Sequence, residues 1–577
     1  MESEKPSTTQ VQHADLLEPS DPDLRAAPVI HAKTIIVVTS VCSVYFAQLM
    51  YLVGAGSHAR DIAAVVGGTD KSSWISSSVP ILAVVLSSPI SQAADLWGRK
   101  WFLVGLTSLG GIGCVITSRA NSMTMAIAGG VIAAASFGAQ PLVIAIPSEV
   151  LPRRLRPVAQ ASSNIIGVLG AVFGLLLGAA VTRKGHVGGF RVYWYIAAGL
   201  YIASALACAL FYNPPPRELQ TTLNRREKMK ALDWMGYALL STGLILFCMS
   251  LIWSQNPYPW TNAHVLATFL IGITISTGLI IYETKYKRDG IFHHKLFMQS
   301  RNFALAVGCI FVEGLVFFTG TYYYPYQVGV LYTADSLLGA LRISVSFLVG
   351  CGSAGIAGWY CSKRRSLRAP LLLSFVFLTL FNVLMATTRP GSNREVWGYI
   401  MIFGFALGVC VLVLISVAQF ATPPSMIATA TGLLVTMRNL GGAVGLAVYK
   451  AVFTHTLSSN LSRRVSEAVL PLGLPASSLK PLITALVTHD TTGISRVPGI
   501  SKSIIAAGGH AVLEAYSAAF RHVWIVAACF GAVGIVLAYF VIDPKEEFNQ
   551  QIDAPVEVQT LSSASHDTME IPRFSGS

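Results

Sequence analysis

Charged residues are scarce in this chain of 577 residues, because only 12% are Asp, Glu, Lys or Arg, whereas 53% are hydrophobic. Soluble domains usually contain about 25% charged residues. Apolar stretches such as GVLGAVFGLLLGAAV also lack the polar face that a soluble surface helix shows at a period of about 3.6 residues. The composition therefore predicts an all-α integral membrane protein and argues against a large soluble helical core.

The sequence also lacks the signatures of most enzymes and cofactor sites. Its nine cysteines are scattered, with no CxxC pair and no His/Cys cluster, which argues against a disulfide framework and against a metal site. No P-loop is present, which argues against a pump driven by a nucleotide. We therefore expect a protein that is not an enzyme, with no catalytic residues, no cofactor and no metal.

Long apolar stretches are what the chain has instead. They recur from about residue 34 to residue 541, each about 20 residues long, and they predict about fourteen transmembrane helices. The first 30 residues are polar and lack the basic start and apolar centre of a cleavable signal, so we expect a disordered tail there.

The distribution of basic residues predicts the orientation. Short connections after even-numbered spans contain more than twice as many Lys and Arg residues as those after odd-numbered spans. By the positive-inside rule these connections and both termini are cytoplasmic, so the net charge of +13 is a topology signal rather than a footprint for nucleic acid. The long connection 454–521 then lies outside, and its Asn460-Leu461-Ser462 sequon makes Asn460 a candidate for N-glycosylation.

A short run of charge, SQAADLWGRK, separates two of the apolar stretches at residues 91–100. The positive-inside rule would explain Arg99 and Lys100 but neither Asp95 nor Gly98. An acid, a tight turn and two cations at this spacing suit an ion-pair cluster that locks two helices together on the cytoplasmic side.

This run resembles the signature of the major facilitator superfamily between spans 2 and 3, Gly-x-x-x-Asp-Arg-x-Gly-Arg-Arg. Ser91 and Leu96 depart from that signature. In that family the motif is a cytoplasmic latch that opens during alternating access, and an acid and basic residues after span 4 complement it. The resemblance gives this role to Asp95, Gly98, Arg99, Lys100, Glu149, Arg153 and Arg156.

Two further patterns resemble the same superfamily. Gly170, Gly174 and Gly178 recur every four residues in span 5 and expose one face to close packing. Their spacing is similar to the antiporter motif of drug exporters, and ordinary helix packing is the alternative. The run GIAGWYCSKRRS at the end of span 10 is a degenerate copy of the first motif that keeps Gly355 and lacks the acid, as expected for a transporter built from repeated halves.

The resemblance implies a major facilitator fold of two six-helix bundles with two inserted spans, most similar to fungal drug:proton antiporters and the trichothecene efflux pump family. The expected parts are a disordered cytoplasmic tail (1–33), the N-terminal bundle (34–212), a cytoplasmic linker (213–233), the inserted spans (234–283), the C-terminal bundle (284–541) with the extracellular loop (454–521), and a cytoplasmic tail (542–577).

Glu313 is the clearest ionisable residue inside a predicted span. A buried carboxyl group can gain and lose a proton as its surroundings change between access states, so Glu313 is a candidate for proton coupling. The alternative is a structural ion pair with Arg438 or Arg342. Arg342 lies near the outer end of span 10, and we expect it to extend to the interface instead.

Candidate residues for a substrate cavity are mostly aromatic or polar. They favour a bulky, amphipathic, roughly neutral molecule. Two positions depart from proton-coupled drug exporters, since Gly130 stands where many have arginine and Gln48 is the polar group of span 1 where many have aspartate. The candidate lining residues are Gln48, Tyr51, Gln140, Phe317 and Tyr322.

The preferred hypothesis is a monomeric exporter of a fungal secondary metabolite, toxin or drug in the plasma membrane, with protons as the coupled ion and lipid as its surroundings. A vacuolar or vesicle membrane is the alternative location. Import of an iron-siderophore chelate is the alternative function, because those carriers share the fourteen-span architecture, and a non-transporting receptor is a third hypothesis.

Overall fold

The computed structural model describes residues 31–182, 187–216, 218–254, 260–287, 290–333, 335–488 and 490–555. Across these ranges the regular structure is helical, without strands. Fourteen of the helices described there are long and apolar enough to cross a membrane, which confirms the number of spans expected from the sequence. Most of the expected N-terminal tail lies outside the described residues, and the first helix already begins at Ala32.

The first bundle contains six spans. Each apolar segment must satisfy its own backbone hydrogen bonds in lipid, which a helix does within one segment. In this bundle α1 packs on α7 and α8, and α4 packs on α5 and α8. The helices are α1 (Ala32–Ser57), the short α2 (Ala59–Val66), α3 (Ser73–Trp97), α4 (Arg99–Ser118), α5 (Met123–Ala134) with α6 (Gln140–Val150) as one span, α7 (Arg156–Thr182) and α8 (Phe190–Phe211).

Two short helices and two inserted spans follow. The polar linker forms α9 (Glu218–Thr222) and α10 (Arg225–Ala231), and Asn224 with Glu227 makes a reciprocal cap at the start of α10. The inserted spans α11 (Trp234–Trp253) and α12 (Ala263–Ile281) pack on each other, and α11 also contacts α3 and α19. They therefore lie beside the junction of the two bundles.

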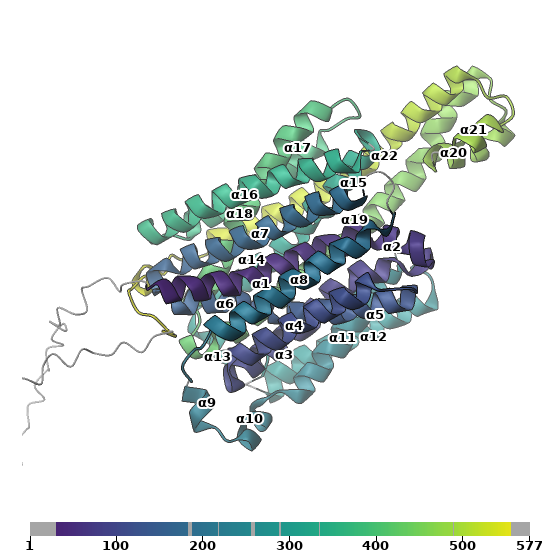
Figure 1. Cartoon of the computed structure of the whole chain (residues 1–577). Coiled ribbons are helices and arrows are strands. Elements are labelled where there is room, and N and C mark those ends of the chain that lie inside the picture. Colours follow the sequence, from purple (N-terminus) through teal and green to yellow (C-terminus); the bar gives the residue numbers. More distant parts are fainter. Residues whose placement is uncertain are drawn as a thin grey trace, which may run out of the picture.

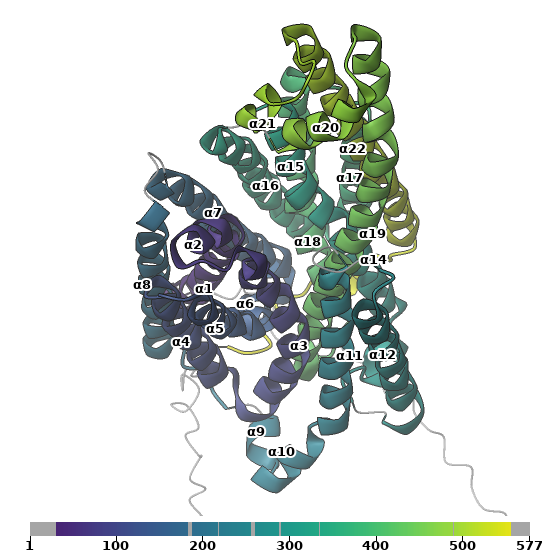
Figure 2. The same cartoon turned by 90° about the vertical axis from the view of Figure 1, so that its right-hand side faces the viewer.

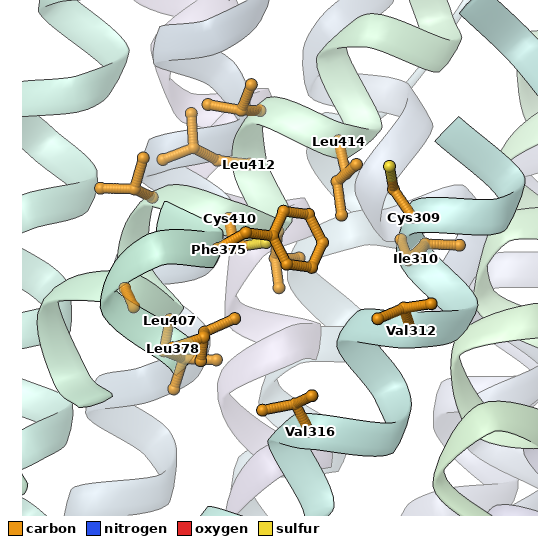
Figure 3. Packing of buried hydrophobic residues seen from close by; sticks show 14 of the residues in the cluster. Cys309, Ile310, Val312, Val316, Phe375, Leu378, Leu407, Cys410, Leu412 and Leu414 are labelled. Carbon is orange, nitrogen blue, oxygen red and sulfur yellow. The ribbon is translucent and has the colours of Figure 1, made fainter. Parts of the chain in front are cut away.

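The second bundle contains the remaining six spans. Figure 3 shows part of its core, where the Phe375 ring points toward the helix that carries Cys309, Ile310 and Val312. Its helices are α13 (His294–Gln299), α14 (Arg301–Phe318), which continues through a π-helical turn (Thr319–Tyr323) into α15 (Tyr324–Leu331), α16 (Ser336–Arg364), α17 (Arg368–Ala386), α18 (Asn393–Phe420), α19 (Ile427–Val469) and α22 (Lys502–Tyr539).

The connection 454–521, expected as a loop, is largely helical where the structure describes it. Helix α19 runs unbroken for 43 residues and α22 for 38 residues, so both continue beyond their apolar spans. Between them lie α20 (Leu479–Val487) and α21 (Thr491–Ser495). This helical extension has a small core of its own, which includes Val465, Leu482 and Val512, and that burial explains why the segment folds.

The molecule has two opposite faces at the ends of its spans. The terminal face carries α9, α10 and residues 543–555, and the distal face carries α2, α20 and α21 (Figure 1). In Figure 2 the N-terminal bundle lies on the left and the C-terminal bundle on the right, with the helical extension at the top. The bundles meet mainly where α3 packs against α19 and where α7 packs against α16.

Candidate functional site

Asp95, Arg99 and Glu149 form a buried cluster at the terminal face. Arg99 donates from Nη2 to Asp95 Oδ1 at 2.6 Å and from Nη1 to Glu149 Oε2. Gly98 separates α3 from α4 with a φ of 100°, a conformation that side chains other than glycine rarely adopt, and it sets Arg99 at the start of α4. One cation is therefore shared by two acids from different helices.

Asp95 also crosses to the other bundle. Its Oδ2 accepts hydrogen bonds from the backbone N–H of Thr429 at 3.1 Å and from the Thr429 hydroxyl at 3.0 Å. Thr429 lies in the first turn of α19, where backbone N–H groups have no partner within their own helix and the helix dipole favours an anion. The cluster therefore joins the N-terminal bundle to the start of α19.

A second set of polar contacts lies beside this cluster. Arg156 donates to the backbone carbonyl of Gln419 at 2.9 Å, and the Gln160 amide donates to the Gln419 side chain at 3.3 Å. Ser88 and Thr436 hydrogen-bond between α3 and α19 at 3.1 Å. All of these contacts lie toward the terminal face, so the described conformation is closed on that side.

The predicted latch residues do not all meet. Lys100 hydrogen-bonds to Asn213 at the exposed end of α8 and takes no part in the buried cluster. Arg153 pairs instead with Glu547 at 2.8 Å and Asp553 at 2.9 Å, which belong to the segment after the last span. Asp95, Arg99 and Glu149 come together, and Arg156 lies beside them, where it contacts Gln419 and Asp553.

The glycine face of α7 packs inside the N-terminal bundle. A side chain at Gly170 would collide with the backbone carbonyl of Phe46 in α1, and one at Gly174 would meet the α1 backbone at Met50. At Gly178 the neighbour is the imidazole of His58, 3.0 Å from the position of an added Cβ. The three glycines allow the backbones of α1 and α7 to approach closely.

Glu313 and Arg438 form the one bidentate ion pair within the described spans of the C-terminal bundle. Arg438 Nε donates to Glu313 Oε2 at 2.7 Å, and Nη2 donates to Oε1 at 3.0 Å. The Glu313 side chain is 1% exposed and that of Arg438 is 19% exposed. The Arg438 guanidinium also lies 4.4 Å from the centre of the Phe317 ring. The pair links α14 to α19, and Arg438 is the partner of Glu313.

The N-terminal bundle presents a tyrosine to this pair. Tyr45 of α1 is 7% exposed and lies within electrostatic range of both Arg438 and Glu313, beside the Gln140 side chain. The sequence analysis missed Tyr45, because it is one of many aromatic residues in apolar stretches and nothing in its local pattern marks it. The central site therefore combines an ion pair from one bundle with a phenol from the other.

Other predicted cavity residues have varied surroundings. Gln48 and Tyr51 are fully buried within the N-terminal bundle and donate hydrogen bonds to the backbone carbonyls of Ser136 and Gly130, both at 2.7 Å. Tyr322 is 46% exposed and stacks on Phe318. In this conformation Gln48 and Tyr51 serve the packing of their own bundle.

Arg342 does not pair with Glu313. It is 2% exposed, donates to the Asn393 side chain at 2.6 Å and lies 4.8 Å from the centre of the Trp397 ring. Both partners lie in the first turns of α18, and the expectation that Arg342 extends to the interface stays a prediction. Asn460 lies in the helical extension of α19, where its side chain donates to the Thr456 carbonyl at 2.8 Å.

Comparison with known proteins agrees with this architecture. A family model described as Major Facilitator Superfamily matches residues 38–446. The MFS-type efflux transporter ffsH of Aspergillus flavipes is 25% identical over 488 residues, covering 81% of this chain and 80% of that protein. The trichothecene efflux pump TRI12 of Fusarium sporotrichioides is 22% identical over 484 residues, covering 82% of this chain and 79% of the pump.

The solved structures give the same fold. The human organic anion transporter MFSD10 superposes with a TM-score of 0.53 at 14% identity, covering 88% of this chain and 99% of that one. Fourteen apolar spans and a family model that covers more than half of the chain identify a multi-pass membrane transporter rather than an enzyme. The chain belongs to the major facilitator superfamily.

Proposed function

We propose that the protein exports a small amphipathic molecule, a secondary metabolite, a trichothecene-like toxin or a drug, in exchange for protons by alternating access. The observation that carries this proposal is the buried bidentate Glu313–Arg438 pair, with Tyr45 of the other bundle within electrostatic range. A buried ion pair is seldom worth its desolvation cost for stability alone, so a functional role accounts for its presence.

The chemistry of the pair suits proton exchange. In the described conformation the charges of Glu313 and Arg438 balance each other through two hydrogen bonds. A proton on Glu313 would cancel the acid's charge and leave Arg438 unbalanced, which favours a rearrangement that brings another acceptor to the guanidinium. Tyr45 of the opposite bundle lies within electrostatic range and is the acceptor we propose, which would couple protonation to the relative position of the bundles.

The class of substrate follows from the side chains around the pair and from the relatives. Phe317 lies against Arg438, and its ring neighbours Phe318 and Phe403 are aromatic as well, which favours bulky and largely apolar molecules. The printed names of the fungal relatives include an efflux transporter and a trichothecene efflux pump, which supports export.

The proposed setting is the plasma membrane, with the terminal face in the cytoplasm and the protein acting as a monomer. Support for this orientation comes from the concentration of Lys and Arg in the connections at the terminal face. The described conformation, closed at the terminal face, would then be one in which the route to the cytoplasm is blocked.

The test measures transport in proteoliposomes with an imposed pH gradient. Glu313→Gln should reduce transport driven by the gradient at least about 100-fold. The new side chain cannot gain or lose a proton, and Arg438 is left without its counter-charge. The double variant Glu313→Gln/Arg438→Gln removes both charges and should fold while transport becomes independent of the gradient. Glu514→Gln, on the helical extension, is the matched control. Gradient-driven transport at the parental rate in folded Glu313→Gln would overturn the coupling role.

A gene deletion tests the direction of transport. Loss of an exporter should sensitise cells to the toxic molecule or trap a metabolite inside them. Impaired growth on an iron chelate as the sole iron source would contradict export and favour import.

A further inference from the structure

The chain after the last span does not leave the molecule at residue 542. Residues 543–555, named here the strap, run across the terminal face from the C-terminal bundle to the N-terminal bundle. Asp543 accepts hydrogen bonds from the backbone N–H groups of Leu367 and Arg368 at 2.6 and 2.8 Å. Phe548 is 2% exposed, and its ring centre lies 4.5 Å from that of Phe420 at the end of α18. The first half of the strap is thus anchored on the C-terminal bundle.

The second half of the strap is anchored on the N-terminal bundle. The backbone N–H groups of Arg153 and Arg154 donate to the carbonyls of Gln551 and Asn549 at 2.9 and 2.8 Å. The N–H of Ala554 donates to the backbone carbonyl of Glu149 at 2.9 Å, and Glu149 is the acid that pairs with Arg99. The strap therefore touches the buried cluster directly.

Asp553 is the buried acid at the contact between the strap and the N-terminal bundle. Its side chain is 2% exposed, accepts from Arg153 Nη2 at 2.9 Å and pairs with Arg156. The Arg156 side chain is 1% exposed, and the same guanidinium donates to the Gln419 carbonyl of the C-terminal bundle. Arg156 is therefore held between α18 and the strap, and without Asp553 it would lie buried beside fewer acceptors.

The two anchors leave no slack between them. Phe548 packs on the C-terminal bundle, and the next residue, Asn549, already bonds to the N-terminal bundle. Consecutive Cα atoms are about 3.8 Å apart, so the strap cannot span a widening gap between bundles. If the terminal face opens, the strap must detach from one side.

We propose that the strap is part of the gate at the terminal face, that Asp553 is its locking residue, and that it must leave Arg153 and Arg156 before that face can open. This inference rests on the proposed alternating access, but its main readout is gate opening rather than transport. The N-terminal anchors release, because they are polar contacts that water can replace, whereas the buried ring of Phe548 keeps the strap on the C-terminal bundle.

The experiment measures opening in nanodiscs, where a maleimide reaches both faces. A cysteine at Ser88, buried between α3 and α19, reports on the closed gate when its labelling is compared with that of the parent chain. Asp553→Asn should raise the labelling rate at least about tenfold, because Arg153 and Arg156 lose their shared counter-charge. Glu547→Gln is the matched control, since that side chain contacts Arg153 but is 45% exposed, and it should change labelling little.

Three further variants keep the test independent of the folding of Asp553→Asn. A chain ending at Pro555 keeps the strap and should behave as the full chain, whereas one ending at Asn549 should label as fast as Asp553→Asn. Cysteines at Arg154 and Asn549, which are joined by a backbone hydrogen bond, should form a disulfide that blocks labelling at Ser88→Cys and stops transport until it is reduced.

Two results would overturn the proposal that the strap is part of the gate. One is a parental labelling rate in folded Asp553→Asn, and the other is free opening of the terminal face while the disulfide is formed. If labelling responds as expected while the pH gradient drives no transport, the strap stands and the proposed coupling fails.

Discussion

The loop between α3 and α4 and its degenerate copy between α16 and α17 each lie beside a helix start that is capped by an acid, but only the first loop supplies that acid itself. In the first loop Asp95 caps α19, which belongs to the other bundle. In the copy, Trp359 stands at the position aligned with Asp95, and the acid comes from elsewhere. Asp543, just after α22, caps α17 within its own bundle. The first loop joins the bundles, whereas the second closes one bundle on itself.

The two loops also break the chain differently. Gly98 ends α3 with a φ of 100°, whereas Ser362, its aligned partner, lies inside α16. Helix α16 continues to Arg364 and ends at Arg365, which has a φ of 53° in the left-handed region. The copy lacks both the acid and the turn that would aim it across the interface, so only the first of the two loops contributes to the closed gate.

Asp95→Asn should produce the largest effect of the changes that separate the two loops. It removes one of the two acids around buried Arg99 and weakens the cap on α19. A loss of roughly 3 kcal/mol corresponds to a factor of about 100 in the ratio of closed to open gates. Labelling at Ser88→Cys should rise and transport should fall, while membrane insertion stays normal. Normal flux and labelling in this variant would refute the latch.

Asp543→Asn should have a moderate effect on stability and a smaller one on the gate. The change weakens a cap on α17, which costs about 1 kcal/mol, and it should lower the midpoint of thermal unfolding by about 2–4 °C. Labelling at Ser88→Cys should rise much less than in Asp95→Asn, because α17 and α22 belong to one bundle. An equal rise in both variants would contradict the distinction between the loops.

Trp359→Asp should have the smallest effect, although it restores the acid that the copy lacks. Trp359 is 60% exposed and lies against Lys363 on the surface of α16, so an acid there points away from the N-terminal bundle. Trp359 lies near the terminal end of its span, where an acid costs far less than at the bilayer centre, so we expect a loss of at most about 1 kcal/mol in the free energy of unfolding and parental labelling at Ser88→Cys. Slower labelling would mean that the acid alone can rebuild the missing contact.

The fold could be predicted from the sequence because the length of each apolar stretch can be seen in the local sequence. Each span is a continuous run whose composition alone requires a helix in lipid. The cluster of Asp95, Arg99 and Glu149 was accessible for a similar reason, since a charged motif stands out in an apolar chain. Glu149 lies outside that motif and was harder to assign. Lys100 lies inside the motif but hydrogen-bonds to Asn213 and does not join the cluster.

The contacts that sequence did not reveal join distant residues. Asp553 meets Arg153 across 400 positions, and nothing near Asp553 distinguishes it from an acid in a solvated tail. Tyr45 and Asp543 are equally inconspicuous in their local sequence. The helical extension was expected as a loop because its polar residues hide the spacing of the few apolar side chains that form its core.

The unbroken course of α19 and α22 into the helical extension has a mechanical consequence. About sixteen residues of α19 beyond residue 453 form a rigid rod of roughly 24 Å at 1.5 Å per residue. Any tilt of α19 as its first turn parts from Asp95 is magnified at the tip of this rod. The tip of the extension should therefore move when the gate at the opposite end of the molecule opens. The distance between one fluorophore on the extension and another on the neighbouring bundle would report that movement.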